Sequence, residues 1–370
     1  MKILYVSNGS NFLTAGGMEY HLMDMCGWLE KNGVETGLAV RKDTFLHRNL
    51  LAGKAHVYPL PWTGAGKVAS IFRLVRAIRE FDPDIISINR EKDIVRIFLI
   101  VKGIGAFLKK KPKIVSVFHN VGWNKNDAVL SRLDGMIFPN CFIRDHYFDG
   151  GEINVPAEVI YHGIRLPEVR PQEKLDPFRK RKFFKNKTFP IIGMVGELRK
   201  NQTELIDVAF YLKRQLNDFT IAIVGRGKDE ETAGLREKIE HLGLADNILL
   251  TGNVERSLIP DIFYDLDISV TTNRREPFGM VFIESLASMT PLVAYDSGGP
   301  VEIIGKGGGI LVSGGPQDMA VELHRIVTDN NERRRLSEEA RGAAEQYFSI
   351  HAMGAAHLRF YRQLNFMKTT

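Results

Sequence analysis

The sequence predicts an α/β protein of two domains, each built on a parallel sheet. Its 370 residues exceed the roughly 250–300 at which a single hydrophobic core usually stops growing. Short β-branched runs alternate with amphipathic helical patterns, as in parallel α/β units. This alternation is interrupted once by a charged, proline-containing stretch and then starts again. Because open parallel sheets bind ligands at the carboxyl ends of their strands, we predict two facing Rossmann-like domains with a cleft between them.

The elements of the first half follow from local patterns. The chain starts with the apolar run Lys2 to Val6, which is typical of a strand. Further strands are expected at residues 36–40, 85–88, 113–118, 136–138 and 159–161. Amphipathic periodicity predicts helices from Met18 to Lys31 and from Lys67 to Phe81. We place the first domain at residues 1–165.

The second half repeats the pattern after a break. Pro167, Pro171 and Pro177 punctuate a stretch that we interpret as an interdomain linker, residues 166–188. Strands are then expected at residues 190–195, 220–224, 248–251, 268–271, 292–294 and 310–312, and helices at 317–327, 331–347 and 351–364. The second domain therefore spans residues 189–347, and a C-terminal helix lies within residues 348–370.

Composition excludes several classes of protein. The hydrophobic fraction of 44% and the charged fraction of 25% exclude a fibrous or disordered chain. Cys26 and Cys141 are the only cysteines, too few for a zinc cluster or a disulfide framework, which favours a reducing compartment. The most apolar stretch, residues 94–107, contains Arg96 and Lys102 and is too short to span a bilayer. With no signal-peptide pattern at the start, we expect a cytoplasmic protein, soluble or peripheral at the inner face of the membrane.

The net charge of +6 favours anionic partners. Basic residues are concentrated in two clusters, one from Lys109 to Lys113 and one from Arg179 to Lys187. Each cluster is either a solvated face or linker, or a surface for anionic lipid headgroups. No nucleic-acid-binding motif accompanies the charge, so nucleic acid is not an expected partner.

The most specific local pattern runs from Glu276 to Glu284. It follows the strand at 268–271 and opens a helix, and Pro277 and Gly279 suit a tight turn before that helix. Backbone N–H groups at a helix start attract anions. Two carboxylates beside an anionic ligand would instead accept hydrogen bonds from hydroxyls, Glu276 from a sugar and Glu284 from a ribose. The alternative is a helix-capping carboxylate and an ordinary surface glutamate.

Three weaker patterns also follow predicted strands. Gly16 and Gly17, after the first strand, would let a diphosphate approach the backbone, or simply make a turn. Arg199 and Lys200 would neutralise a departing diphosphate, or remain solvated cations. His119, after the strand ending at Phe118, would contact a donor sugar or be satisfied within its own loop.

Together these patterns resemble glycosyltransferase family 4, whose members have the GT-B fold. The segments that carry the resemblance are, in chain order, Gly16-Gly17-Met18-Glu19, His119, Gly196–Gln202, Val224–Gly227, Leu250–Val254, Glu276–Glu284 and Asp296–Glu302. The similarity extends over nearly the whole chain and is densest from Pro190 to Gly314. The glutamate pair with Pro-Phe-Gly between its members is the specific part.

The resemblance implies an acceptor-binding first domain and a donor-binding second domain, with the helix around Phe360 and Tyr361 returning to the first. The donor-binding residues would be Gly16, Gly17, Arg199, Lys200, Val254, Glu276, Phe278, Gly279, Met280, Val281 and Glu284. His119, Glu276 and Lys200 would be catalytic. The family is retaining and needs no metal or other cofactor. The Asp82/Asp84 and Asp265/Asp267 pairs both precede a predicted strand, the wrong side of the sheet for a metal in the cleft.

One departure bears on catalysis. Glu197 occupies the position where the family places an arginine after glycine, and Arg199 is the candidate to supply the missing charge. The hypothesis is a front-face displacement in which the leaving phosphate oxygen takes the acceptor's proton. Lys200 and Arg199 would meet the developing phosphate charge, while Glu276 and His119 hold the sugar.

Alternatives remain at this point. A nucleotide-sugar epimerase would need an acid/base pair that the sequence does not show, and a dehydrogenase would need a GxGxxG fingerprint that is absent. A non-catalytic nucleotide-sugar-binding protein stays open because of Glu197. The sugar and the base (UDP, GDP or ADP) are not resolved. The basic clusters favour a glycan or lipid-linked acceptor in cell-envelope polysaccharide or lipopolysaccharide synthesis.

Overall fold

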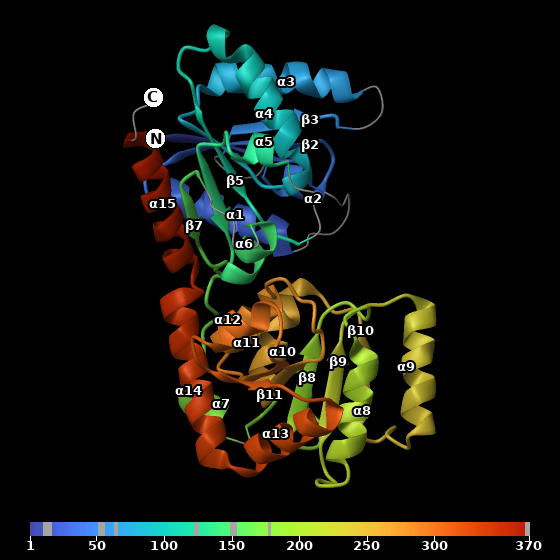
Figure 1. The fold of residues 1–370 in the computed structure, drawn as a ribbon. Coiled ribbons are helices and arrows are strands. Elements are labelled where there is room, and N and C mark those ends of the chain that lie inside the picture. Colours follow the sequence, from blue (N-terminus) through green and yellow to red (C-terminus); the bar gives the residue numbers. More distant parts are fainter. Residues whose placement is uncertain are drawn as a thin grey trace. The chain divides into compact units, whose positions relative to one another are not determined.

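The computed structural model describes residues 1–9, 17–50, 56–62, 66–121, 126–148, 154–176 and 179–366. The chain forms two compact units (Figure 1). Unit 1 comprises Met1–Ile164 together with Ile350–Thr370, and unit 2 comprises Arg165–Ser349. Each unit is a parallel α/β domain. None of the helices in the described residues combines the length and the apolarity needed to cross a membrane.

The sheet of unit 1 is parallel throughout, with the strand order β3-β2-β1-β4-β5-β6-β7 in the described residues. Its strands are β1 Lys2–Ser7, β2 Glu35–Arg41, β3 His56–Leu60, β4 Ile85–Ile88, β5 Lys113–Val117, β6 Gly135–Phe138 and β7 Ala157–Val159. The order reverses between β1 and β4. Such a switch point opens a crevice at the carboxyl ends of the strands, where α/β proteins bind ligands.

Helices cover both faces of this sheet. They are α1 Gly17–Lys31, α2 Phe45–Leu50, α3 Gly66–Phe81, α4 Ile94–Ile104, α5 Asp127–Leu130, α6 Cys141–Phe148 and α15 Ile350–Phe366. Alternate β1 residues point to opposite faces, so that Leu4 and Val6 pack with α3 and α4. Ile3 and Tyr5 pack with α1 and α15 on the other face. The final helix is thus part of the core of unit 1.

Unit 2 repeats this design with the strand order β10-β9-β8-β11-β12-β13 among its described residues. The strands are β8 Ile191–Val195, β9 Thr220–Val224, β10 Ile248–Gly252, β11 Ile268–Thr271, β12 Leu292–Tyr295 and β13 Gly309–Val312. They are parallel. The order reverses between β8 and β11, so the second switch point lies there.

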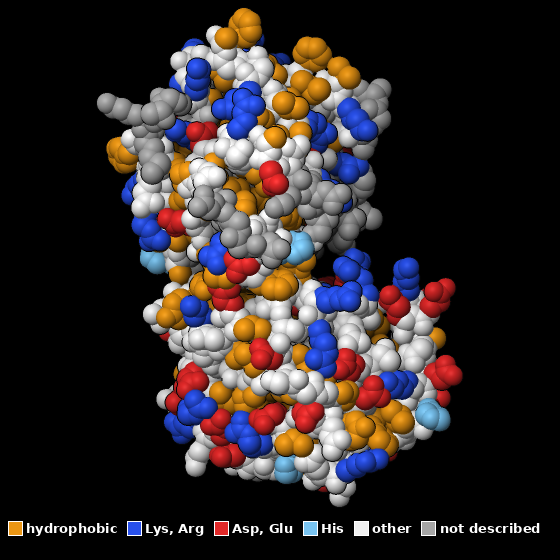
Figure 2. Space-filling model, in the orientation of Figure 1, with side chains coloured by type: hydrophobic (Ala, Val, Ile, Leu, Met, Phe, Trp, Pro, Cys, Tyr) orange, Lys and Arg blue, Asp and Glu red, His pale blue; other side chains and the backbone are white. Residues whose placement is uncertain are grey.

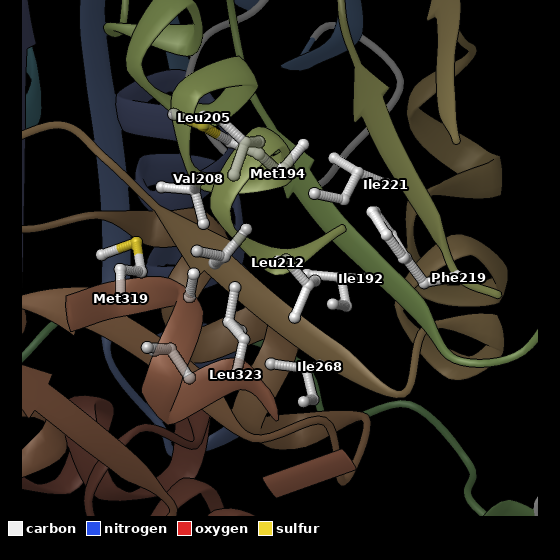
Figure 3. Packing of buried hydrophobic residues seen from close by; sticks show 14 of the residues in the cluster. Ile192, Met194, Leu205, Val208, Leu212, Phe219, Ile221, Ile268, Met319 and Leu323 are labelled. Atoms are coloured by element: carbon white, nitrogen blue, oxygen red, sulfur yellow. The ribbon is translucent and has the colours of Figure 1, made fainter. Parts of the chain in front are cut away.

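The helices of unit 2 are α7 Pro171–Leu175, α8 Gln202–Leu212, α9 Asp229–His241, α10 Ile259–Asp265, α11 Met280–Ala287, α12 Gly299–Ile304, α13 Pro316–Thr328 and α14 Asn330–Tyr347. Figure 3 shows the larger core, in which β8 residues Ile192 and Met194 meet Leu205 and Leu212 of α8 and Leu323 of α13. Ile191 and Val195 point the other way, toward α10. The packing of α8, α10 and α13 against β8 thereby fixes the position of the strand end that carries part of the site.

Sequence patterns missed or displaced two strands of unit 1. β3, at His56–Leu60, was not predicted because Pro59 interrupts its short run; a proline is tolerated there because β3 is an edge strand. β7 lies at Ala157–Val159 rather than at 159–161. The other predicted strands coincide with observed ones to within one or two residues.

The predicted linker at residues 166–188 belongs, from its first residue, to unit 2. Two arginines of its basic cluster are buried, contrary to both interpretations of that cluster. The Nη1 of Arg179 lies 3.0 Å from Oδ1 of Asp267, and the Nη2 of Arg181 lies 2.9 Å from Oδ2. A buried carboxylate needs such partners, because an unpaired charge is costly away from water. Of this cluster, the lysines remain exposed: Lys180, Lys182, Lys185 and Lys187.

Lys174, in the same segment, is almost fully buried at the end of α10. Its Nζ donates to the backbone oxygens of Phe263, Tyr264 and Leu266 at 3.2, 2.8 and 2.5 Å, and to Oγ1 of Thr290 at 2.8 Å. The last carbonyls of a helix have no intrahelical donor. Lys174 supplies that donor, while burial lowers the pKa of its amino group well below the usual range.

Replacing Lys174 by methionine is therefore expected to destabilise unit 2. The side-chain volume is kept but the buried carbonyls lose their donor, which should lower the free energy of unfolding by about 2–4 kcal/mol. Urea unfolding followed by fluorescence measures the change. Lys182→Met removes only an exposed pair with Asp261 and should cost less than about 1 kcal/mol. Equal losses in the two variants would show that burial of Lys174 has no special role.

Candidate functional site

The candidate site of unit 2 begins with the turn that joins β11 to α11. Gly279 has φ of 94°, and a Cβ there would lie 2.1 Å from the ring of Phe282. Only glycine fits this left-handed, crowded position. The backbone N–H of Gly299 donates to the oxygen of Glu276 at 2.8 Å and holds the other end of the turn. The turn is therefore fixed in a shape that starts helix α11 at Met280.

Glu276 forms the centre of this site. Its Oε2 accepts from Nζ of Lys200 at 2.7 Å and from Nδ2 of Asn273 at 3.0 Å. Glu276 is buried, and the side chain of Lys200 is about a quarter exposed. The two residues come from loops that follow β8 and β11, the strands at the switch point. Sequence analysis assigned both residues to the site, and the structure brings them into direct contact.

A second set of hydrogen bonds joins the loops that follow β8 and β11. Asn201 has φ of 64° and caps α8. Its Nδ2 donates to the oxygen of Thr272 at 3.1 Å, and Oγ1 of Thr272 donates to the oxygen of Asn201 at 2.7 Å. This reciprocal pair sets the distance between the loops. Lys200 therefore meets Glu276 on a preformed scaffold, which is what electrostatic stabilisation requires.

Glu284 lies in α11 and is buried rather than exposed. Its carboxylate forms a two-pronged ion pair with Arg256, one contact being Nη1 to Oε2 at 3.1 Å. Arg256 begins the short 3₁₀ helix η3, Arg256–Leu258, which follows β10. Burial raises the pKa of Glu284, and Arg256 opposes this shift. Sequence analysis missed Arg256, because an arginine in a charged loop carries no signal of the carboxylate that it meets.

Arg199 lies apart from this arrangement. Its Nε donates to Oε2 of Glu197 at 2.6 Å, and its side chain is 70% exposed. Arg226 approaches the other oxygen of Glu197 at 3.9 Å. The hydrogen bond from Arg199 holds the pKa of Glu197 below its usual range. The cation that contacts Glu276 in unit 2 is thus Lys200, while Arg199 neutralises the unusual Glu197.

The apolar members of the predicted donor site surround the turn. Phe278 is buried, whereas Met280, Val281 and Val254 are partly exposed. Val281 lines a small pocket together with Lys200 and Glu276. Val254 packs with the cluster around α10. Of these four side chains, Val281 therefore lies beside the polar pair.

In unit 1 the structure places His119 directly after β5, among other buried histidines. Nδ1 of His119 lies 3.3 Å from Nε2 of His162, and the two rings stack with centroids 5.1 Å apart. His21 of α1 lies 4.4 Å from His162 by ring centroids, and His357 of α15 lies 6.3 Å from His21. All four are buried. His21 and His119 thus belong to one histidine cluster.

Burial keeps this histidine cluster neutral. It lowers the pKa of His119, although the carboxylates of Glu91 and Glu19 oppose the shift. It also lowers the pKa values of His21 and His162, and it lowers that of His357 to about 4. Nε2 of His119 has no hydrogen-bond partner within the described residues. A neutral imidazole can donate or accept, so this buried atom has an unused hydrogen-bonding position.

The loop that carries His119 is held by a carboxylate that sequence analysis missed. Oε1 of Glu91 accepts from the backbone N–H groups of His119 and Asn120 at 2.5 and 3.0 Å. Glu91 is buried and begins the 3₁₀ helix η1, Glu91–Asp93, which follows β4. The hydroxyl of Tyr147 donates to the oxygen of Asn120 at 2.8 Å. Glu91 therefore positions His119 from the neighbouring strand end.

The glycine pair after β1 is only partly described. Gly17 is the first residue of α1 and is partly buried. Gly16 lies outside the described residues, and so does the loop before it from residue 10. The proposed approach of a diphosphate to these glycines therefore stays a prediction.

The two aspartate pairs are engaged in structural contacts. Asp84 accepts from Nζ of Lys110 at 2.8 Å, and Asp82 lies 3.8 Å from the same ammonium. Asp265 accepts from the backbone N–H of Phe183 at 2.5 Å, and Asp267 pairs with the buried arginines. Both pairs precede a strand, as the sequence predicts. Among the described residues, no group of three or more His, Cys, Asp or Glu side chains is arranged to hold a metal ion.

Comparison with known sequences identifies relatives of both units. The model of the family described as "Glycosyl transferases group 1" matches residues 176–343, and that of "Glycosyltransferase Family 4" matches residues 15–167. The lipopolysaccharide core biosynthesis mannosyltransferase LpsB of Rhizobium meliloti (strain 1021) is 28% identical over 61% of this chain and 65% of its own length. The alpha-D-kanosaminyltransferase of Streptomyces kanamyceticus is 28% identical over 47% of this chain and 46% of its own length. The matches thus span about half to two thirds of these relatives.

Solved structures share the fold over almost the whole chain. The Anabaena protein Alr3699/HepE in complex with UDP has a TM-score of 0.81 at 20% identity, covering 98% of this chain and 100% of its own. A complex of the same protein with UDP-glucose gives a TM-score of 0.78. A glycosyltransferase from Rickettsia africae ESF-5 has a TM-score of 0.79 at 18% identity and covers 99% of both chains. The two α/β units therefore have the GT-B fold that sequence analysis predicts.

Proposed function

Since this chain belongs to the group 1, family 4 type of glycosyltransferases, we propose that it transfers a hexose-type sugar from a nucleotide-diphosphate sugar to a hydroxyl of a glycan or glycolipid, with retention of configuration. The observation that carries the proposal is the contact between Lys200 and Glu276 at the switch point of unit 2. The reaction develops a negative charge on the leaving phosphate and a positive charge on the sugar. The cation Lys200 complements the first charge, and the carboxylate Glu276 complements the second.

In the proposed reaction the donor's diphosphate lies at Lys200 and the start of α11. The first N–H groups of a helix have no intrahelical acceptor and attract anions. Lys200 then neutralises the negative charge that grows on the leaving phosphate. The phosphate oxygen that leaves takes the proton of the attacking hydroxyl, so no separate protein base is needed. Arg199 contributes at longer range, because its guanidinium is already paired with Glu197.

The carboxylates bind hydroxyls in this scheme. Glu276 accepts from the sugar while Lys200 and Asn273 hold its other contacts. Glu284 accepts from the ribose, and Arg256 orients this buried carboxylate and opposes the rise of its pKa that burial causes. In unit 1, Glu91 fixes the loop of His119, whose Nε2 offers a contact for a sugar hydroxyl. Positioning and charge stabilisation thus account for the proposed catalysis.

The names of relatives support an envelope glycan as acceptor. LpsB and the LpcC protein of Rhizobium leguminosarum bv. viciae are both described as lipopolysaccharide core biosynthesis mannosyltransferases. An alpha-monoglucosyldiacylglycerol synthase of Streptococcus pneumoniae, also similar, is named for a lipid product. We therefore propose a glycan or lipid-linked acceptor. For the donor, the UDP and UDP-glucose complexes of the Anabaena protein make uridine nucleotides the first candidates.

A thermal-shift series tests the donor site. UDP, GDP, ADP and their common sugar conjugates are added one at a time without metal. A ligand at 100 times its Kd stabilises a protein by about 2.7 kcal/mol, so one nucleotide series should raise the melting temperature clearly. Glu284→Gln should weaken binding of that nucleotide about tenfold, because a charged acceptor becomes neutral.

The matched control is Glu338→Gln, on the exposed side of α14, which should respond to nucleotide as the unmodified protein does. The donor site proposed here would be wrong if no nucleotide shifted the unmodified protein, or if Glu284→Gln bound nucleotide unchanged.

Because of Glu197, a second candidate function also has to be tested, that of a binding protein. In the position of the family's arginine it presents a negative charge, and it binds both Arg199 and Arg226. A protein that binds nucleotide sugars without transferring them would show the same thermal shift. Sugar transfer to acceptors, or slow hydrolysis of the donor in their absence, separates the enzyme from the binding protein.

A further inference from the structure

Helices α3 and α4 carry an unusual outer surface on unit 1. Most large hydrophobic side chains of the described residues that are well exposed lie here: Val68, Ile71 and Phe72 on α3, Leu99 on α4, and Phe107 in the following 3₁₀ helix η2, Gly105–Phe107. Phe72 and Phe107 are each 71% exposed, and Leu99 is 60% exposed. We call these five residues the α3–α4 face. Exposed aromatic and aliphatic side chains gathered in this way mark an interaction surface.

The inner sides of the same helices explain why this surface is not needed for folding. Leu74 and Ile78 of α3, and Ile97 and Phe98 of α4, are buried in the core beneath the sheet. Each of the two helices therefore packs against the core with one side and exposes the other side. Among the described residues of unit 1, neither Phe72 nor Phe107 belongs to a buried hydrophobic cluster.

The charge around the α3–α4 face is strongly positive. Between Ile94 and Lys113 the sequence has six Lys and Arg residues and no Asp or Glu. Three of them, Arg96, Lys110 and Lys113, pair with Asp93, Asp84 and Asp134. Lys102, Lys109 and Lys111 are exposed there, as are Lys67 and Arg73 on α3. In the space-filling view, hydrophobic and basic side chains intermingle over α3 and α4 (Figure 2). The pattern is that of an amphipathic surface whose apolar side chains enter a membrane while the cations stay at the headgroups.

We propose that the α3–α4 face docks unit 1 onto an anionic lipid bilayer. Phe72, Leu99 and Phe107 enter the boundary between headgroups and acyl chains, and Lys102, Lys109 and Lys111 bind the lipid phosphates. Charge complementarity selects this occupant, because a basic surface interspersed with apolar side chains matches a negatively charged and apolar interface. The inference goes beyond the proposed reaction, since docking requires neither donor nor turnover. It assigns membrane contact to this face and not to the cluster from Arg179 to Lys187, whose two arginines are buried.

Vesicle co-sedimentation of the full chain tests the proposal. Vesicles of phosphatidylglycerol and phosphatidylcholine in equal amounts should bind the protein at low salt, and vesicles of phosphatidylcholine alone should bind it much less. Raising the ionic strength should release it, because surface charges are screened. Lys109→Glu/Lys111→Glu should weaken binding by at least about tenfold, since each basic residue near an anionic surface adds to the attraction.

Two matched control variants test whether binding depends on the α3–α4 face itself or only on the total charge and apolarity of the protein surface. Lys185→Glu/Lys187→Glu makes the same charge change in the exposed part of the other cluster and should leave most binding intact. Phe72→Ser/Phe107→Ser should also weaken binding by about tenfold or more, because the apolar side chains that enter the acyl boundary are lost. Val321→Ser/Phe366→Ser, at exposed positions on α13 and α15, should not. The nucleotide-dependent thermal shift should be unchanged in all four variants, which shows that they fold.

Several outcomes would overturn the proposal. They are a chain that does not bind anionic vesicles at low salt, a chain that binds neutral vesicles equally, and control variants that lose as much binding as those on the α3–α4 face. Self-association that depends on Phe72 and Phe107, without vesicle binding, would instead assign the face to a second copy of the chain. Vesicle binding without any nucleotide shift would leave the docking surface standing and contradict the proposed function.

Discussion

Replacement of Lys200 by alanine is expected to lower kcat about 10²–10³-fold, while the KM for acceptor changes little. The Nζ of Lys200 lies 2.7 Å from Glu276, at the point where the leaving phosphate is proposed to gain charge. Loss of a preorganised cation raises the energy of that charge more than it affects binding of a neutral acceptor. Steady-state kinetics with the donor identified by thermal shift measure both constants.

The control for this prediction is the neighbouring arginine. Arg199→Ala removes an equal charge one residue away, but its guanidinium is exposed and paired with Glu197. We expect kcat to fall less than about tenfold, since exposed ion pairs contribute little. A fully active Lys200→Ala enzyme would contradict the role of Lys200. A larger loss for Arg199→Ala than for Lys200→Ala would instead show that Arg199 replaces the family's missing arginine.

The second large effect is a loss of stability in acid. The ordinary pKa of histidine is 6.5, and burial lowers the pKa values of His21, His119, His162 and His357 below it. Below pH 6.5 the unfolded chain therefore binds protons that the folded histidine cluster does not. Stability is fully present above about pH 6.5 and is lost as the pH falls toward the folded values, which for His357 is about 4. Each histidine contributes a slope of up to about 1.4 kcal/mol per pH unit.

Urea unfolding of the protein between pH 7.5 and 4.5 measures this slope. His357→Gln should reduce the dependence of the free energy of unfolding on pH by the equivalent of about one bound proton. The reason is that a neutral amide replaces an imidazole that takes up a proton when the chain unfolds in acid. The matched control is His241→Gln, which makes the same replacement at an exposed histidine. Glu19 and Glu91 face His119 and oppose the downward shift of its pKa, so the contribution of His119 should be the smallest. Equal stability at pH 5 and pH 7 would contradict the prediction.

Most of the fold is predictable from the sequence, because the fold depends on periodic patterns of apolar residues. The apolar runs that form β1 and β8 are buried on both faces of their sheets, and the amphipathic stripe of α3 is buried on one side. Burial of both kinds is visible in the order of residues. β3 was not predicted, because a short edge strand that contains Pro59 shows little of that pattern. Local periodicity thus identifies elements whose burial is regular.

The site was predicted only in part, because its partners come from distant segments. Glu276 and Lys200 were found from their place after strands, and the structure adds their contact. Glu91 and Arg256 were missed, since nothing in their own surroundings shows that they hold His119 and Glu284. Arg179 and Arg181 were interpreted as exposed because a basic run looks the same whether it is solvated or buried against Asp267. Pairing of charges across the chain is a tertiary property.

The helix α15 has a consequence for how the protein is made. Unit 2 is one continuous stretch, Arg165–Ser349, whereas unit 1 is completed by Ile350–Thr370. Phe360, Tyr361 and Leu364 fill the core beside β1 and β6, and Gly135 has no room for a Cβ because Leu364 lies against it. During synthesis unit 2 can fold once Arg165–Ser349 has emerged, but unit 1 lacks part of its core until the later segment Ile350–Phe366 has emerged. Unit 1, whose first strand is made before unit 2, is therefore completed after it.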